Sequence, residues 1–189
     1  MADELRRRPA KPVGRKRDED LTASILKAAG DQLLEVGFDR LTTQDVATRA
    51  GAGKGAIYRR WATKEALLAD AIRAMPARSD EVTDDPIADL RAIVRDRCES
   101  AERQPDLVPG LITAMRADAG IDEAVKAGLD LAYVRDAIAR VVGAGHPHLE
   151  LLTELTQAIP LFRATFAPDT LHAAAMTEEI MAHIEAAAD

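Results

Sequence analysis

The sequence predicts an all-α fold, and its composition and patterning give three reasons. Apolar residues make up 47% of the 189 residues, but aromatic residues make up only 3%, and alanine is abundant. This mixture favours helices, because alanine has the highest helix propensity, whereas sheets favour aromatic and β-branched residues. From residue 18 onward, apolar residues recur at steps of three and four, and no stretch alternates as a strand would.

Composition also limits the class of protein. A chain of 189 residues can form one compact domain, or a small domain attached to a larger one. The single cysteine, Cys98, cannot form an internal disulfide, which is typical of a reducing compartment. Because no apolar run has the length of a membrane span and no secretory signal is visible, we expect a soluble, cytoplasmic protein without a membrane partner.

Charge is distributed unevenly along this acidic chain, whose formal net charge is −7. Residues 1–17 hold seven Lys or Arg against two acids, whereas residues 75–189 hold ten against twenty-one. The first 17 residues also contain two prolines and no apolar period, so we expect a flexible basic arm. It is either a solvated tail or, if a nucleic-acid-binding module follows, an arm whose Arg15, Lys16 and Arg17 contact phosphates or the minor groove.

Two helices are predicted next, joined by a short connection, and a glycine-containing turn follows the second of them. The first covers residues 18–36, starts with three acids that suit the positive end of the helix dipole, and stops at Gly37. The second starts at Thr42, an N-cap residue that Asp45 supports as in a shortened capping box, and ends at Gly51. With the helix that follows, this second helix forms a candidate helix-turn-helix.

The segment AGAGKGAIYRRW, residues 50–61, excludes acids although the chain holds 32 of them. At 100° per residue, Ile57 and Trp61 define the buried side of a helix, and Gly55 and Arg59 point almost opposite. An acid on the exposed side would repel a phosphate backbone, which explains the exclusion. An ordinary amphipathic helix with a solvated basic face is the alternative. The outward arc and the first turn would hold Lys54, Ala56, Tyr58 and Arg60.

A family resemblance rests on these residues. The run GFDRLTTQDVATRAGAGKGAIYRRWATKEALLADAI, residues 37–72, resembles the DNA-binding domain of the TetR (tetracycline-repressor) family of bacterial transcriptional regulators. The resemblance implies a helix-turn-helix DNA-binding domain at residues 18–75, and an effector-binding and dimerisation domain at residues 76–189. It also implies a recognition helix near residues 53–60, in the major groove of double-stranded DNA. The DNA contacts that it implies are Thr42, Thr43, Lys54, Gly55, Ala56, Tyr58, Arg59, Arg60 and, on a phosphate, Lys64.

The remaining chain is predicted to be helical. Helices are expected at residues 63–75, 86–103 and 149–166, with a shorter one around residues 107–115, a long one along 127–141 and a last one near the C-terminus. Pro160 should kink the 149–166 helix. An apolar lining suggests an apolar or amphipathic effector. We expect its pocket among Met75, Leu90, Val94, Leu111, Met115, Val134, Ile138 and Phe162.

The 149–166 helix is apolar on more than one stripe, so it is either the central core helix or part of a dimer interface. The family resemblance implies that it pairs with the last helix and their symmetry mates in a four-helix homodimer interface. That interface would use Leu152, Leu155, Ile159, Phe166, Met181 and Ile184. Two recognition helices on a two-fold axis would read a near-palindromic operator.

Three classes of function compete. The first is a ligand-responsive homodimeric DNA-binding regulator, most often a repressor. The second is a helical enzyme, for which the sequence offers no nucleophile set, carboxylate pair, metal-ligand spacing or phosphate-binding loop, so no catalytic residue and no cofactor are expected. The third is a dimeric small-molecule-binding protein without specific DNA readout. The order of helices and glycine turn favours the first.

Overall fold

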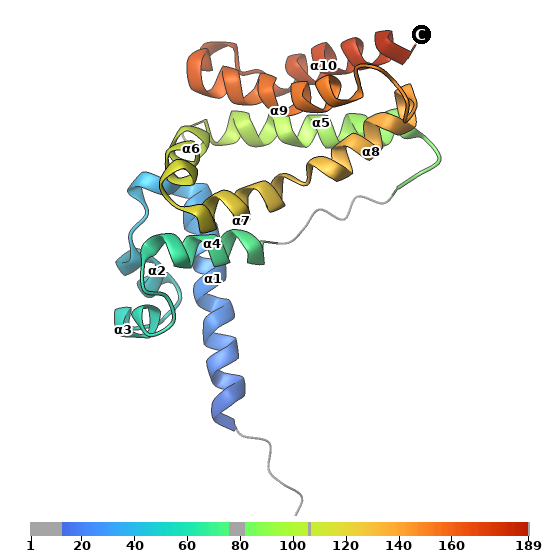
Figure 1. Ribbon diagram of the computed structural model, residues 1–189. Coiled ribbons are helices and arrows are strands. Elements are labelled where there is room, and N and C mark those ends of the chain that lie inside the picture. Colours follow the sequence, from blue (N-terminus) through green and yellow to red (C-terminus); the bar gives the residue numbers. More distant parts are fainter. Residues whose placement is uncertain (1–12, 76–81, 106, 189) are drawn as a thin grey trace, which may run out of the picture.

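The all-α prediction is confirmed by a computed structural model that describes residues 13–75, 82–105 and 107–188. No strand occurs among these residues (Figure 1). No helix within the described ranges is long and apolar enough to span a membrane. The α-helices are α1 (Val13–Arg40), α2 (Thr43–Arg49), α3 (Lys54–Tyr58), α4 (Lys64–Ala74), α5 (Pro86–Arg103), α6 (Leu107–Ala117), α7 (Ala119–Leu129), α8 (Leu131–Val142), α9 (Leu149–Phe166) and α10 (Ala173–Ala188); a 3-10 turn covers Pro168–Thr170.

The first helix is longer at its start than the sequence predicts. It begins at Val13, so residues 13–17, assigned above to a flexible arm, are helical. Lys and Arg are good helix formers, and residues 13–40 contain no proline, so the helix can extend backwards past the acids. Gly37 has φ 77° and interrupts the helix at the predicted stop, because glycine adopts positive φ without steric cost.

The predicted helix along residues 127–141 is instead two helices. Asp130 has a left-handed backbone (φ 42°) between α7 and α8, and its carboxylate accepts a hydrogen bond from the backbone N–H of Tyr133 at 3.2 Å. Aspartate tolerates this conformation and caps a helix N-terminus, so it starts a new helix without interrupting the apolar period. The break lets α7 pack against α4 and α8 pack against α5 and α9.

Two hydrophobic cores divide the molecule. The N-terminal core joins α1–α4 to α6 and α7, with Ile25, Leu67 and Ile121 fully buried. The C-terminal core joins α5, α8, α9 and α10 around Ile138 and Met176. Two helices from the segment after residue 76, α6 and α7, therefore pack with the N-terminal helices. In Figure 1, α9 and α10 lie at the opposite end of the molecule from α3.

Candidate DNA-binding surface and ligand cavity

The second and third helices form the tight pair that the sequence predicts. The hydroxyl of Thr42 accepts a hydrogen bond from the N–H of Asp45 at 3.2 Å and donates to its carboxylate at 2.6 Å, so Thr42 caps α2. Gly51 has φ 62° in the turn, and the Ala52 N–H donates to the Ala47 carbonyl at 2.8 Å. The turn is therefore held by backbone hydrogen bonds at a position that favours glycine.

The buried side of α3 agrees with the helical-wheel prediction. Ile57 is fully buried, and Trp61 is 6% exposed, in the N-terminal core. The indole Nε1–H of Trp61 donates to the Asp70 carboxylate at 2.9 Å, which satisfies its polar atom. Lys54, Gly55, Tyr58 and Arg59 are exposed on the other side of the helix. This exposed set holds two cations and no acid.

Tyr58 and Thr43 connect α3 to α2 at this surface. Their hydroxyl oxygens lie 3.1 Å apart, and the Lys54 Nζ lies 5.7 Å from the centre of the Tyr58 ring. Tyr58 is 49% exposed, whereas Thr43 is only 8% exposed, so Thr43 supports the tyrosine and is not itself on the surface. The predicted outward position of Thr43 is corrected accordingly, because the first turn of α2 presents it to α3.

Ala56 and Arg60 also differ from their predicted positions on the outward arc. Ala56 is 7% exposed. The Arg60 guanidinium turns back to α1, where it donates to the Thr22 hydroxyl at 2.9 Å and pairs with Asp18; it also donates to the Ala56 carbonyl at 2.8 Å. The reason is that two side chains of α1, Asp18 and Thr22, lie within reach of the guanidinium. Arg60 therefore fixes α3 to α1.

Lys64 lies at the start of α4, which Thr63 caps by accepting a hydrogen bond from the Ala66 N–H at 3.1 Å. The Lys64 Nζ donates to the Phe38 carbonyl at 2.6 Å and lies 4.7 Å from the centre of the Phe38 ring. An ammonium has three N–H donors, so this contact leaves Lys64 with donors for another acceptor. Of the predicted arm residues, Arg17 is exposed, and the side chains of Arg15 and Lys16 lie outside the described part of the structure.

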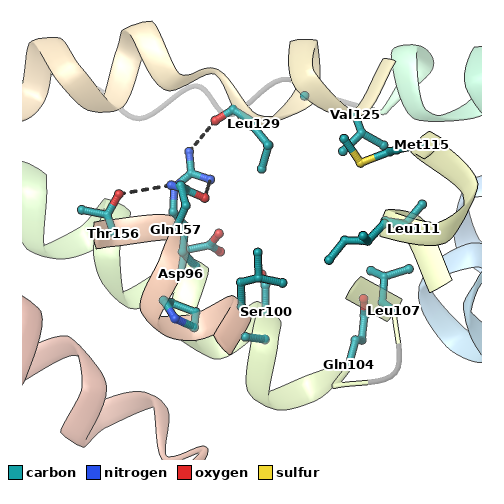
Figure 2. A pocket seen from close by; sticks show the side chains of 16 residues that line it. Asp96, Ser100, Gln104, Leu107, Leu111, Met115, Val125, Leu129, Thr156 and Gln157 are labelled. Atoms are coloured by element: carbon teal, nitrogen blue, oxygen red, sulfur yellow. Dashed lines mark hydrogen bonds between the residues drawn. The ribbon is translucent and has the colours of Figure 1, made fainter. Parts of the chain in front are cut away.

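A cavity of about 410 Å³ lies between the two cores. Its walls come from α5 and α9 on one side and from α6 and α7 on the other, as Figure 2 shows. This volume falls at the small end of the usual range for ligand sites, roughly 300–1,000 Å³. The residues that line it are Asp96, Arg97, Ser100, Ala101, Gln104, Leu107, Leu111, Ile112, Met115, Val125, Gly128, Leu129, Thr156, Gln157, Pro160 and Leu161.

The structure corrects most of the predicted pocket lining. Leu111 and Met115 do line the cavity. Leu90, Val94, Val134 and Ile138 are instead fully buried in the C-terminal core, because α5 and α8 pack directly on one another. Met75 packs at the edge of the N-terminal core, and Phe162 is 59% exposed on α9. Pro160, which was expected to kink the 149–166 helix, is among the residues that line the cavity.

The predicted dimer residues separate into two groups. Leu152, Met181 and Ile184 are buried in the core of their own subunit, which corrects their assignment to an interface. Leu155 and Ile159 are half-buried, and Phe166 is 74% exposed. Leu151 and Phe162 are more than half exposed on the same helix, and neither was predicted there. We call Leu151, Leu155, Phe162 and Phe166, spaced at helical intervals, the α9 stripe.

Cys98 and the histidines offer no second site. Cys98 is fully buried in the C-terminal core, and this burial raises the pKa of its thiol, so it acts as a small apolar residue. Within the described ranges, no group of three or more His, Cys, Asp or Glu side chains is placed to hold a metal ion.

Comparison with known proteins adds a family match. Residues 25–71 match the family described as "Bacterial regulatory proteins, tetR family". The chain is 31% identical over 163 residues to the DNA-binding transcriptional repressor TetR of Mycobacteroides abscessus, covering 79% of this chain and 84% of that protein. It is 39% identical over 83 residues to the HTH-type transcriptional regulator YdeS of Bacillus subtilis, covering 44% of this chain and 39% of that protein.

Solved structures resemble the fold across nearly the whole chain. A TetR transcriptional regulator from Rhodococcus sp. RHA1 has a TM-score of 0.56 at 19% identity, covering 91% of this chain and 97% of that one. Salmonella enterica GusR has a TM-score of 0.58 at 14% identity, covering 96% and 98%. At these identities the likeness concerns the fold alone.

Proposed function

The chain belongs to the TetR family of bacterial regulatory proteins, and from that premise we propose a homodimeric repressor that releases a palindromic operator when a small molecule fills the cavity. The relative in Mycobacteroides abscessus is named a DNA-binding transcriptional repressor. That name supports DNA binding and repression as the proposed activity of the present chain. The family is one of regulators, not enzymes. No catalytic step is part of the proposal.

The exposed side of α3 is the observation that carries DNA binding. Lys54, Tyr58 and Arg59 present two cations and a phenol hydroxyl. Gly55 between them has no side chain, and a Cβ there would lie 3.5 Å from an Arg59 guanidinium nitrogen, in ordinary contact. Backbone can thus approach base edges closely, while the neighbouring side chains reach phosphates.

The α9 stripe supports the homodimer. Its two phenylalanine rings, Phe162 and Phe166, lie 5.3 Å apart between centroids with their planes tilted by 41°, and both are open to solvent in the subunit. A contiguous apolar patch of this kind on one helix face favours burial against a second copy. A two-fold axis near α9 would place two α3 helices in successive major grooves, ~34–36 Å apart.

The position of the cavity supports release by a ligand. The cavity is bounded by helices of both cores, so a molecule inside it contacts α6 and α7, which pack with the DNA-binding helices. A ligand that binds better to a state with altered spacing of the two α3 helices must weaken operator binding by the same factor.

Operator binding is tested by selecting fragments from genomic DNA with the purified protein and measuring affinity by fluorescence anisotropy. We expect a near-palindromic site and a steep loss of affinity as salt rises. Lys54→Ala should weaken binding and flatten the salt dependence, whereas Lys126→Ala, which removes an exposed cation from α7, should change neither. Equal competition by random DNA would instead favour the ligand-binding protein without specific DNA readout.

Repression is tested with a reporter gene placed behind the selected fragment. We expect expression to rise when the gene for this protein is deleted and to fall when it is restored. A fall in expression on deletion would show an activator, and would reject repression while leaving DNA binding intact.

A further inference from the structure

We infer that the cavity takes an uncharged amphipathic molecule, with its apolar body against α6 and α7 and a hydroxyl or amide end against α5 and α9. The inference rests on the proposed function, in which this cavity holds the effector, and it adds the chemical class and the orientation of that effector. It is carried by the unequal chemistry of the two walls.

The wall from α6 and α7 is apolar. Leu107, Leu111 and Met115 come from α6, and Val125 from α7; Figure 2 shows all four on one side of the open space. No polar side chain from these two helices is among the residues that line the cavity. A hydrocarbon or aromatic surface gains free energy by leaving water for this wall, whereas a polar group would lose its hydrogen bonds there.

The opposite wall supplies every polar side chain that lines the cavity, from α5 and its C-cap and from α9. The Arg97 guanidinium donates to the Gln157 side-chain oxygen on α9 at 2.9 Å and reaches across to the Leu129 carbonyl at the end of α7 at 2.7 Å. The Gln157 amide donates in turn to the Thr156 hydroxyl at 3.2 Å. The Asp96 carboxylate is directed toward the open space in Figure 2. This wall thus contains both hydrogen-bond donors and hydrogen-bond acceptors.

Charge on this wall selects against ions. Asp96 and Arg97 are neighbours with opposite formal charges, so the attraction that either would exert on an ionic ligand is reduced by the other. An ion in the cavity would also face the apolar wall. The free-energy cost of removing it from water would exceed its net attraction to the opposite charges of Asp96 and Arg97. A neutral hydroxyl or amide can donate to Asp96 and accept from Gln157 at a much smaller desolvation cost.

The test compares three ligands that share one aromatic body and differ in charge: 2-naphthalenemethanol, 2-naphthoate and 2-naphthylmethylammonium. Their dissociation constants for the full-length protein are measured at neutral pH by isothermal titration calorimetry. We expect the alcohol to bind at least about 10-fold more tightly than either ion, because burial of an unpaired charge is disfavoured. The inference is overturned if either ion binds as tightly as the alcohol or if the alcohol does not bind.

Two variants locate the binding. Ser100 is exposed at the cavity, so Ser100→Trp should obstruct it and abolish alcohol binding, while Glu102→Trp, also exposed on α5 but not lining the cavity, should not. Unchanged binding in Ser100→Trp overturns the inference. Asp96→Asn removes the negative charge, so the preference for alcohol over naphthoate should shrink; Glu102→Gln is the matched control. A preference unchanged in Asp96→Asn contradicts the charge argument.

Operator binding, measured separately, distinguishes this inference from the proposed function. If the alcohol binds as expected but the operator affinity does not change, the ligand class stands and the effector role fails. If the ions bind better than the alcohol, the ligand class fails and the repressor proposal stands.

Discussion

The Tyr58 side chain is both held in place by α2 and exposed at the α2–α3 surface. Its hydroxyl lies 3.1 Å from that of Thr43, and its ring remains about half exposed beside Lys54. The hydroxyl therefore holds the side chain in place, and the ring and oxygen remain available to a phosphate.

We predict that Tyr58→Phe weakens operator binding by roughly 5-fold, since a lost hydrogen bond costs about 1 kcal/mol, and that Tyr58→Ala weakens it further. The measurement is anisotropy titration with the selected operator, with thermal unfolding as a check that the fold persists. Equal affinities for the wild type and both variants would show that this side chain does not contact DNA.

Asp89 gives a prediction about pH. Its carboxylate accepts hydrogen bonds from the Thr83 hydroxyl at 2.6 Å, the Thr83 N–H at 2.9 Å and the Arg140 guanidinium at 2.7 Å. These groups lower the pKa of Asp89, chiefly through the Thr83 hydroxyl and then through Arg140. Because the folded pKa lies below the unfolded value near 3.9, the stabilisation is complete above that value and is lost as the pH falls through the folded pKa.

We therefore predict that Asp89→Asn lowers the urea midpoint at pH 7 and that the difference from wild type shrinks as the pH falls below about 4. Asp136→Asn, at an exposed position on α8, is the control and should change the midpoint little at either pH. A deficit for Asp89→Asn that stays constant down to low pH would contradict the assignment to this carboxylate.

Single residues also show where sequence reasoning stops. Ile57 and Trp61 were predictable as buried, because helical periodicity alone places them on the inner side. The inward turn of Arg60 was not, because its contacts with Asp18 and Thr22 depend on where α1 lies relative to α3. Helical periodicity predicts which side of a helix is buried and which is exposed. Whether the residues between these two sides are buried depends on a neighbouring helix.

At the scale of elements, α4 connects the end of the α2–α3 pair to α7, one of the helices that line the cavity. Asp70 accepts from the Trp61 indole at 2.9 Å and from Arg73 at 3.1 Å. Arg73 also donates to the Gly120 carbonyl at 3.1 Å and to Glu123 at 3.3 Å on α7, whose C-terminal half lines the cavity. One continuous set of polar contacts thus runs from Trp61, just after α3, through α4 to the first half of α7.

We predict that Arg73→Ala reduces the response of operator binding to a ligand more than it reduces binding itself. Loss of the guanidinium removes the polar contacts between α4 and α7, so displacement of α7 by a ligand is transmitted less completely. The ratio of operator dissociation constants with and without saturating 2-naphthalenemethanol measures the coupling. Arg103→Ala, which removes an exposed arginine paired with Glu99 on α5, is the control; an unchanged ratio in Arg73→Ala would rule out this route.

The helices themselves were largely predictable, but the break between α7 and α8 and the buried face of α9 were not. The steps of three and four in α5 and α9 predict both helices, with their starts and ends. At Asp130 the apolar period continues across a break, because the aspartate ends one helix and caps the next. The sequence of α9 contains more than one apolar stripe. Periodicity alone does not show which stripe packs in the core and which is exposed to solvent.

At the scale of the whole molecule, the cavity results from the way the two cores share the chain. Because α6 and α7 pack with α1 and α4, one wall of the cavity belongs to the N-terminal core, and α5 and α9 of the C-terminal core form the other. Sequence reasoning placed the pocket around core residues such as Leu90 and Ile138, since apolarity marks lining and core alike. Lining residues can be distinguished from core residues only when each helix is assigned to one of the two cores.

The α9 stripe gives the prediction that belongs to the assembled protein. Phe162 and Phe166 are 59% and 74% exposed in the subunit, and the proposed dimer buries them. Phe162→Glu combined with Phe166→Glu places like charges opposite one another across a two-fold axis, which should leave the 20.4 kDa subunit monomeric in sedimentation velocity.

Operator affinity should fall together with the dimer, by at least about 100-fold, because each α3 must then bind its half-site without the effective concentration that tethering supplies. Circular dichroism should remain that of the wild type, since neither side chain belongs to a core. Val82→Glu, which adds the same charge at a side chain 68% exposed before α5, is the control. A double variant that still sediments as a dimer would place the subunit interface elsewhere, and a monomer with full operator affinity would show that one recognition helix suffices.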